Sequence, residues 1–146
     1  KLYILGEFYD EKFRSCILKL ITELKLEDKV VFKGFTNNTT DFYYNSSGFL
    51  MCSQNEGMGR VTVEAMFYGC LVFGFNSGGT KDLVTDEITG FLFNDIDELV
   101  KKMSFSLKHP KETISMIEKA QLFVIDNFME EPYANKLFNI YKNILK

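Results

Sequence analysis

Short apolar runs that alternate with helical stretches constrain the fold of this chain most strongly. The runs are continuously apolar, which is typical of strands that are covered on both faces. Between the first two runs, apolar residues recur at spacings of three and four, the pattern of an amphipathic helix. Strand, helix, strand, helix is the order that builds a parallel sheet, so we predict an α/β fold, an open parallel sheet with helices on both faces. The predicted strands are Leu2–Leu5, Val30–Phe32, Gly48–Cys52, Leu71–Phe75 and Phe91–Phe93.

Glycine, proline and capping residues indicate where the helices begin and end. Gly69 ends a helix that begins near Arg60. Asn94 or Asp95 caps another, and the pattern from Pro110 onward is helical, with a break near Pro132. Shorter helical turns are expected within 39–44 and 78–84. We interpret the aromatic residues on core-facing positions as packing residues; these are Phe13, Phe32, Phe49, Phe73, Phe91 and Phe93.

The composition excludes several classes of protein. With 146 residues, of which 46% are hydrophobic and 25% charged, the chain has enough apolar material for one soluble domain. A net charge of −3 without a Lys/Arg cluster argues against a nucleic-acid partner. One histidine and three scattered cysteines make a zinc site improbable and indicate a reducing compartment. No apolar run reaches the roughly 18 residues of a membrane-spanning helix.

The most informative segment is 53–66, which follows the third predicted strand. Ligands of open parallel sheets bind at the carboxyl ends of the strands, where helices begin. Gly57 and Gly59 allow the backbone to approach a ligand closely. The helix that follows offers unpaired N–H groups and the positive end of its dipole. These features together favour a diphosphate ligand.

Two carboxylates flank this predicted diphosphate site. Glu56 precedes the helix, and Glu64 lies within it and can lean back toward the helix start. Eight helical residues span roughly 12 Å, so one nucleotide-sugar can reach both side chains. A carboxylate accepts hydrogen bonds from two neighbouring hydroxyls, which ribose and hexose both present. The order along the surface is therefore expected to be sugar, diphosphate, ribose.

The segment from Glu56 to Met66 resembles the E-x7-E signature of glycosyltransferase family 4. Other segments are similar to that family in the same order, and together they cover nearly all of the chain. The resemblance implies the C-terminal, donor-binding lobe of a GT-B enzyme, a Rossmann-like domain. The other matching segments are Leu2–Gly6, Val30–Phe35, Gly78–Val84 and Thr89–Leu92.

The resemblance also implies an activity and a role for each matching residue. It implies a retaining transfer of a sugar from a nucleoside-diphosphate sugar to a glycan or lipid-linked acceptor, without a metal or other cofactor. Glu56 is implied as the catalytic residue, which holds the donor sugar's hydroxyls, and Glu64 as the ribose ligand. Gly34 and Phe35 are implied to lie beside the base. The implied ligands of the donor sugar and diphosphate are Gly57, Met58, Gly59, Arg60 and Val61.

The chain also departs from the family pattern. It starts at once with a strand, so we expect residues 1–146 to be a fragment that lacks the N-terminal acceptor lobe and the first, normally central, strand of this lobe. The fragment alone is expected to be inactive. Met58, Leu71 and Asp82 stand where the family often has Phe, Pro and Glu. The full-length protein is expected in the cytoplasm or at the inner face of the membrane, in peripheral association with it, building a surface polysaccharide.

Other readings of the same residues stay open at this point. The chain is alternatively a non-catalytic, Rossmann-like module that binds a nucleotide or nucleotide-sugar, and an epimerase of GT-B fold is a weaker alternative. Glu56 and Glu64 are alternatively solvated side chains, and Gly78 with Gly79 a plain turn. Asp95-Ile96-Asp97 spells a D-x-D metal motif, but its place before a helix favours capping.

Overall fold

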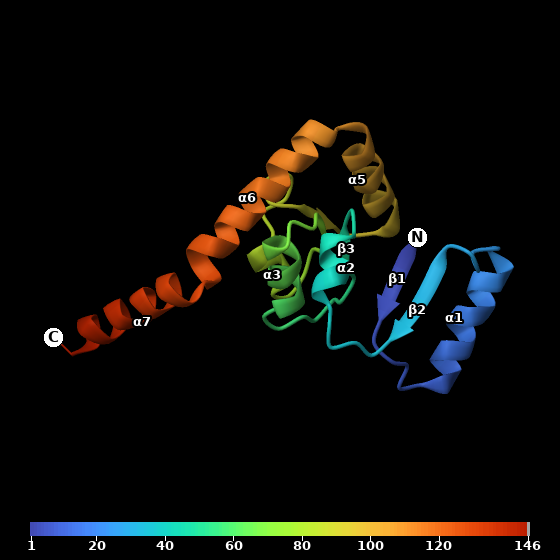
Figure 1. The fold of residues 1–146 in the computed structure, drawn as a ribbon, viewed down its shortest axis with the longest axis horizontal. Helices are drawn as coiled ribbons and strands as arrows, with labels where there is room; N and C mark the ends of the chain where they lie inside the picture. The colour runs from blue at the N-terminus through green and yellow to red at the C-terminus, as the bar shows by residue number, and fades with distance from the viewer. Residues whose placement is uncertain (146) are drawn as a thin grey trace. The chain divides into compact units, whose positions relative to one another are not determined.

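The computed structural model describes residues 1–145, which divide into two compact units, 1–39 and the chain from Thr40 onward. The first unit consists of β1 (Leu2–Leu5), α1 (Glu11–Glu23) and β2 (Val30–Gly34) (Figure 1). The two strands are parallel, with Leu2 opposite Val30, and the register shifts between Ile4 and Leu5. Asp10 caps α1, because its carboxylate accepts hydrogen bonds from the first-turn amides of Lys12 and Phe13.

The second unit contains a parallel sheet of three strands with the order β3-β4-β5. Its strands are β3 (Phe49–Met51), β4 (Val72–Phe75) and β5 (Phe91–Phe93). Helices connect and follow these strands: α2 (Thr40–Tyr44), α3 (Arg60–Phe67), α4 (Thr80–Leu83), α5 (Ile96–Lys108), α6 (Pro110–Phe128) and α7 (Glu130–Ile144). The predicted α/β class is confirmed, with parallel strands flanked by helices. The strands form two sheets, one in each unit, where one sheet was expected.

Two groups of buried side chains form the core of the second unit. The first joins β4 to α3 and α6, and the fully buried Ala65, Val72 and Val124 lie at its centre. The second lies on β4 and β5, where the rings of Phe73 and Phe91 stack with centroids 5.5 Å apart. The strands are buried along their whole length because their side chains are apolar at every position, as the sequence indicated.

Two predictions about local structure were wrong. The C-terminal helical region breaks at Met129, whose backbone is extended, and not at Pro132. Pro132 is the third residue of α7, where the missing N–H costs nothing because first-turn amides have no partner within the helix. Phe13 is 59% exposed, so it is not a core residue, although its ring lies 6.3 Å from that of Phe8.

The last helix of the second unit, α7, has no buried residue. It continues from the end of α6 and extends away from the β3-β4-β5 sheet (Figure 1). Its apolar side chains are therefore largely exposed, including Phe138 at 65% and Ile144 at 72%. Within residues 1–145, none of the helices combines the length and the apolar composition that a membrane crossing requires.

Candidate functional site

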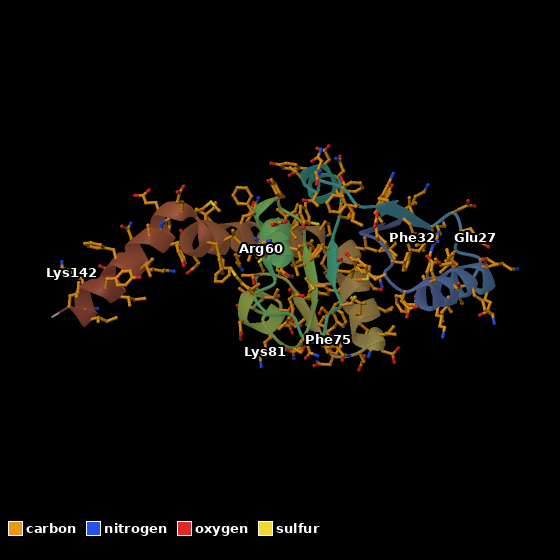
Figure 2. The ribbon with its side chains drawn as sticks, turned by 90° about the horizontal axis from the view of Figure 1, so that it is seen from below. Glu27, Phe32, Arg60, Phe75, Lys81 and Lys142 are labelled. Atoms are coloured by element: carbon orange, nitrogen blue, oxygen red, sulfur yellow. The ribbon has the colours of Figure 1, made fainter. Side chains whose placement is uncertain are left out.

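The start of α3 lies at the end of the loop that follows β3, as predicted. Gly59 has a left-handed backbone, with φ of 68°, and its carbonyl accepts the N–H of Thr62 at 2.8 Å. The amides of the first helical turn, those of Arg60 and Val61 among them, have no acceptor within an α-helix. Arg60 and Val61 are exposed, so this end of the helix is open to a solute (Figure 2). The helix start can therefore bind an anion through its backbone.

A second loop, between β4 and α4, supports the loop that carries Glu56. The Gly79 amide donates a 2.8 Å hydrogen bond to the Glu56 carbonyl oxygen, and the Ser77 hydroxyl donates to the Gln54 carbonyl. A Cβ on Gly78 would lie 2.6 Å from the Glu56 carbonyl oxygen. Both glycines of this loop are thus explained by close backbone packing. Figure 2 labels Phe75 and Lys81 on either side of the loop.

Glu56 itself is partly exposed beside the start of α3. Its Cγ lies 3.4 Å from the position that a Cβ on Gly59 would occupy, so glycine at 59 leaves room for this side chain. Met58, between them, is 57% exposed. The predicted sugar- and diphosphate-binding residues, Glu56 to Val61, therefore lie together at one helix end. Glu56 has the position from which a carboxylate can contact a group bound at that end.

Glu64 lies on α3 and is partly buried. The Tyr43 hydroxyl is 3.4 Å from its Oε2 and equally far from the Val61 carbonyl oxygen. Tyr43 comes from α2 and is only 8% exposed. Burial, together with the charge and the hydrogen bond of Glu64, raises the pKa of Tyr43 to about 12. The sequence analysis missed Tyr43, because only the packing of α2 on α3 brings it to Glu64.

The residues predicted beside the base, Gly34 and Phe35, lie in the first unit. Gly34 has φ of 66°, and its carbonyl accepts the Gly6 amide at 2.8 Å. Phe35 is 73% exposed, which leaves its ring face free to stack on a planar ligand. A hollow of about 380 Å³ opens at this end of β1 and β2, and Arg14 of α1 is among its lining residues.

The D-x-D sequence at 95–97 has a structural explanation. The Asp95 carboxylate accepts the Glu98 amide at 2.8 Å and thereby caps α5, as the position before a helix predicted. No group of three or more metal-ligating side chains occurs among the residues that the structure describes.

Comparison with known proteins shows the family of this chain. Residues 1–123 match the family described as glycosyl transferases group 1. The chain belongs to the group 1 glycosyl transferases. The match includes both units and the whole of the segment from Glu56 to Glu64. Only the last turn or so of α6 and all of α7 lie outside it.

Group 1 glycosyl transferases of other organisms extend well beyond the length of this chain. An uncharacterized glycosyltransferase of Haemophilus influenzae is 35% identical over 130 residues, which are 86% of this chain and 35% of that protein. Among solved structures, Anabaena HepE, in complex with UDP, has a TM-score of 0.86 at 24% identity, and the match covers 97% of this chain and 40% of HepE. S. aureus TarM, in complex with Fondaparinux, alpha-GlcNAc-glycerol and UDP, has a TM-score of 0.83 at 25% identity, covering 97% of this chain and 29% of TarM.

Proposed function

We propose that this chain is the donor-binding domain of a retaining glycosyltransferase of family 4. In the full-length protein it holds a nucleoside-diphosphate sugar, whose sugar is transferred to a glycan or lipid-linked acceptor bound by the N-terminal lobe. One observation carries this proposal: the start of α3 is open to solute, and Glu56 and Glu64 lie before it and along it.

The diphosphate occupies the helix start in this proposal. The amides of Arg60 and Val61 donate to its oxygens, and those of Met58 and Gly59 lie near the sugar. Bond cleavage leaves additional negative charge on the departing diphosphate. A fixed helix end stabilises that charge more in the transition state than in the ground state, because its dipoles are already oriented. Neither a metal nor another cofactor takes part in this step.

The two carboxylates bind the hydroxylated rings at either end of the donor. Glu56 accepts hydrogen bonds from the sugar's hydroxyls, and its negative charge favours the positive charge that develops at the anomeric carbon. Glu64 accepts hydrogen bonds from the ribose. The brace from Gly79 to the Glu56 carbonyl holds the Glu56 loop in place, and this rigidity preserves the geometry on which such stabilisation depends.

UDP is the nucleotide that we propose for the donor. TarM, which has 25% identity to this chain, was solved with UDP. The exposed Phe35 and the hollow between β1, β2 and α1 provide the first unit with an aromatic face and a cavity for the base. We place the complete enzyme in the cytoplasm or at the inner face of the membrane, where it builds a surface polysaccharide.

Calorimetric titration of the full-length protein with UDP tests the proposal. Glu64→Ala is expected to weaken UDP binding about tenfold or more, because a charged hydrogen-bond acceptor is lost. Glu118→Ala is the matched control, because Glu118 is an exposed glutamate on the surface of α6. An unchanged dissociation constant in Glu64→Ala would contradict the ribose contact. Binding of UDP-sugars without transfer to any acceptor would instead favour a non-catalytic nucleotide-binding module.

A further inference from the structure

We propose that Tyr43 is a positioning residue for the donor site: its hydroxyl orients the Glu64 carboxylate for the ribose. The inference rests on the proposed function, because it takes Glu64 as the ribose ligand. It adds to that function a residue from α2, a helix that the binding motif does not include.

The contact between the two side chains has the right chemistry for this role. The Tyr43 hydroxyl lies 3.4 Å from Glu64 Oε2 and 3.4 Å from the Val61 carbonyl oxygen. A phenol has one proton to donate, and the charged carboxylate is the stronger of the two acceptors. Both distances are long for hydrogen bonds, so a small shift of Glu64 toward Tyr43 strengthens the contact. The Val61 carbonyl is the alternative acceptor when Glu64 turns away.

Packing fixes the place of the Tyr43 hydroxyl. The Tyr43 ring stacks on that of Tyr68, with centroids 5.8 Å apart and planes 13° apart. It also meets the Phe49 ring edge-on, again with centroids 5.8 Å apart. Because Tyr43 is only 8% exposed, the ring has no room to take another rotamer. The donor is therefore a rigid part of the core at the edge of the site.

Glu64 needs such a support because its side chain is flexible. A glutamate has three rotatable bonds and loses up to about 2 kcal/mol of conformational entropy when it is fixed. A bond from Tyr43 to Oε2 selects a subset of rotamers before the ligand binds. It uses one lone pair and leaves Oε1 and the remaining lone pairs for the two ribose hydroxyls. Fixing the acceptor in advance raises affinity because less entropy is lost on binding.

Tyr43 stays a hydrogen-bond donor across the physiological pH range. Its burial and the nearby Glu64 raise its pKa to about 12, and Cys70 and Tyr68, which also face it, act in the same direction. The phenol therefore keeps its proton at any pH at which the enzyme works. A neutral donor beside an ionised carboxylate is the combination that the positioning role requires.

Tyr43→Phe in the full-length protein tests the inference, since it removes the hydroxyl and keeps the packed ring. UDP affinity is expected to fall about three- to tenfold, the effect of losing one hydrogen bond to a charged group. The preference for UDP over 2′-deoxy-UDP is expected to shrink as well, because the lost order affects the ribose contact. Tyr44→Phe is the matched control: Tyr44 is the next residue and also contacts the Tyr68 ring, but it is 67% exposed.

A double variant separates this inference from the proposed function. If Tyr43 acts through Glu64, Tyr43→Phe has no further effect on UDP affinity in the Glu64→Ala background. An equal loss in both backgrounds, or an unchanged preference over 2′-deoxy-UDP, would overturn the positioning role. If Glu64→Ala weakens UDP binding and Tyr43→Phe does not, only the positioning role fails. If Glu64→Ala itself has no effect, the ribose contact of the proposed function fails.

Discussion

The Gly79 amide and the Gly57 carbonyl belong to adjacent loops that pack so closely that no side chain fits between them. A Cβ on Gly79 would collide with the Gly57 carbonyl oxygen. Gly79 has φ of −66°, which any residue can adopt, so the close contact alone requires glycine at this position. The neighbouring Gly78, at φ of 52°, combines a close contact with a left-handed backbone.

Gly79→Ala is accordingly expected to separate the two loops. The added methyl meets backbone atoms, which cannot rotate away, so we expect a loss of about 2 kcal/mol or more in the free energy of unfolding. Weaker UDP binding should accompany the loss, because the Glu56 loop loses its brace. Denaturant unfolding measures the first effect and calorimetry the second.

Gly57→Ala is the control for stability. A Cβ at this position would meet no atom within 4 Å. Its free energy of unfolding should therefore stay within about 0.5 kcal/mol of the wild type. Equal destabilisation by the two substitutions would contradict the explanation from close packing.

Alkaline pH should destabilise the wild type through Tyr43. Its pKa is about 12 in the folded state, against 10 for an exposed tyrosine. As pH rises above 10, the unfolded chain loses this proton first, so stability falls between pH 10 and pH 12. Tyr43→Phe lacks this component, and its unfolding free energy should fall less over the same range, by up to about 2 kcal/mol. Parallel unfolding curves for the two proteins from pH 9 upward would argue against a buried, protonated Tyr43.

Acidic pH should weaken the ion-pair network around Lys102. Hydrogen bonds from the Lys102 side chain and from the Asn94 backbone amide lower the pKa of Glu98 to about 2. Lys102 also pairs with Asp86 at 2.8 Å. The stabilisation from Glu98 is thus complete above about pH 4.5 and is lost as pH falls toward 2.

Lys102→Met is expected to lower the melting temperature by a few degrees near neutral pH, and by less as pH approaches 2. Lys101→Met is the control, because Lys101 is the exposed neighbour on the same helix. Thermal unfolding followed by circular dichroism over this pH range distinguishes the two. A melting-temperature difference that does not change with pH would assign the effect of Lys102 to packing alone.

Nucleotide binding is expected not to depend on a divalent cation. In the proposed site, backbone amides and a helix dipole compensate the diphosphate charge, so no metal has to bridge it. The dissociation constant for UDP should change by no more than about twofold between excess EDTA and excess Mg²⁺. A large loss of affinity in EDTA would show that a cation takes part in donor binding.

The sequence was sufficient to predict features that depend on neighbours along the chain. The predicted strand at Phe91–Phe93 is the observed β5, and Asp95 caps the helix that follows. The start of α3 was predictable because glycines and a helical pattern are adjacent in the sequence. Such features depend on backbone conformation and local hydrogen bonds, which the residue types largely determine.

Features that depend on distant packing could not be predicted. Tyr43 and Glu64 are 21 residues apart, and no spacing rule connects a short helix to the second turn of a longer one. The role of Gly79 likewise depends on a loop more than twenty residues earlier in the chain. The error at Pro132 has a different source, since proline is unfavourable in a helix interior but tolerated in its first turn.

The extended backbone at Met129 makes the last helix a lever. Residues 130–144 form a rod about 22 Å long, and their only described packing on another element is on α6. A rotation of about 10° at that joint displaces the far end of the rod by about 4 Å, with no rearrangement of the buried core. The exposed rings of Tyr133 and Phe138 would then sweep through an arc set by the torsion angles of a single residue.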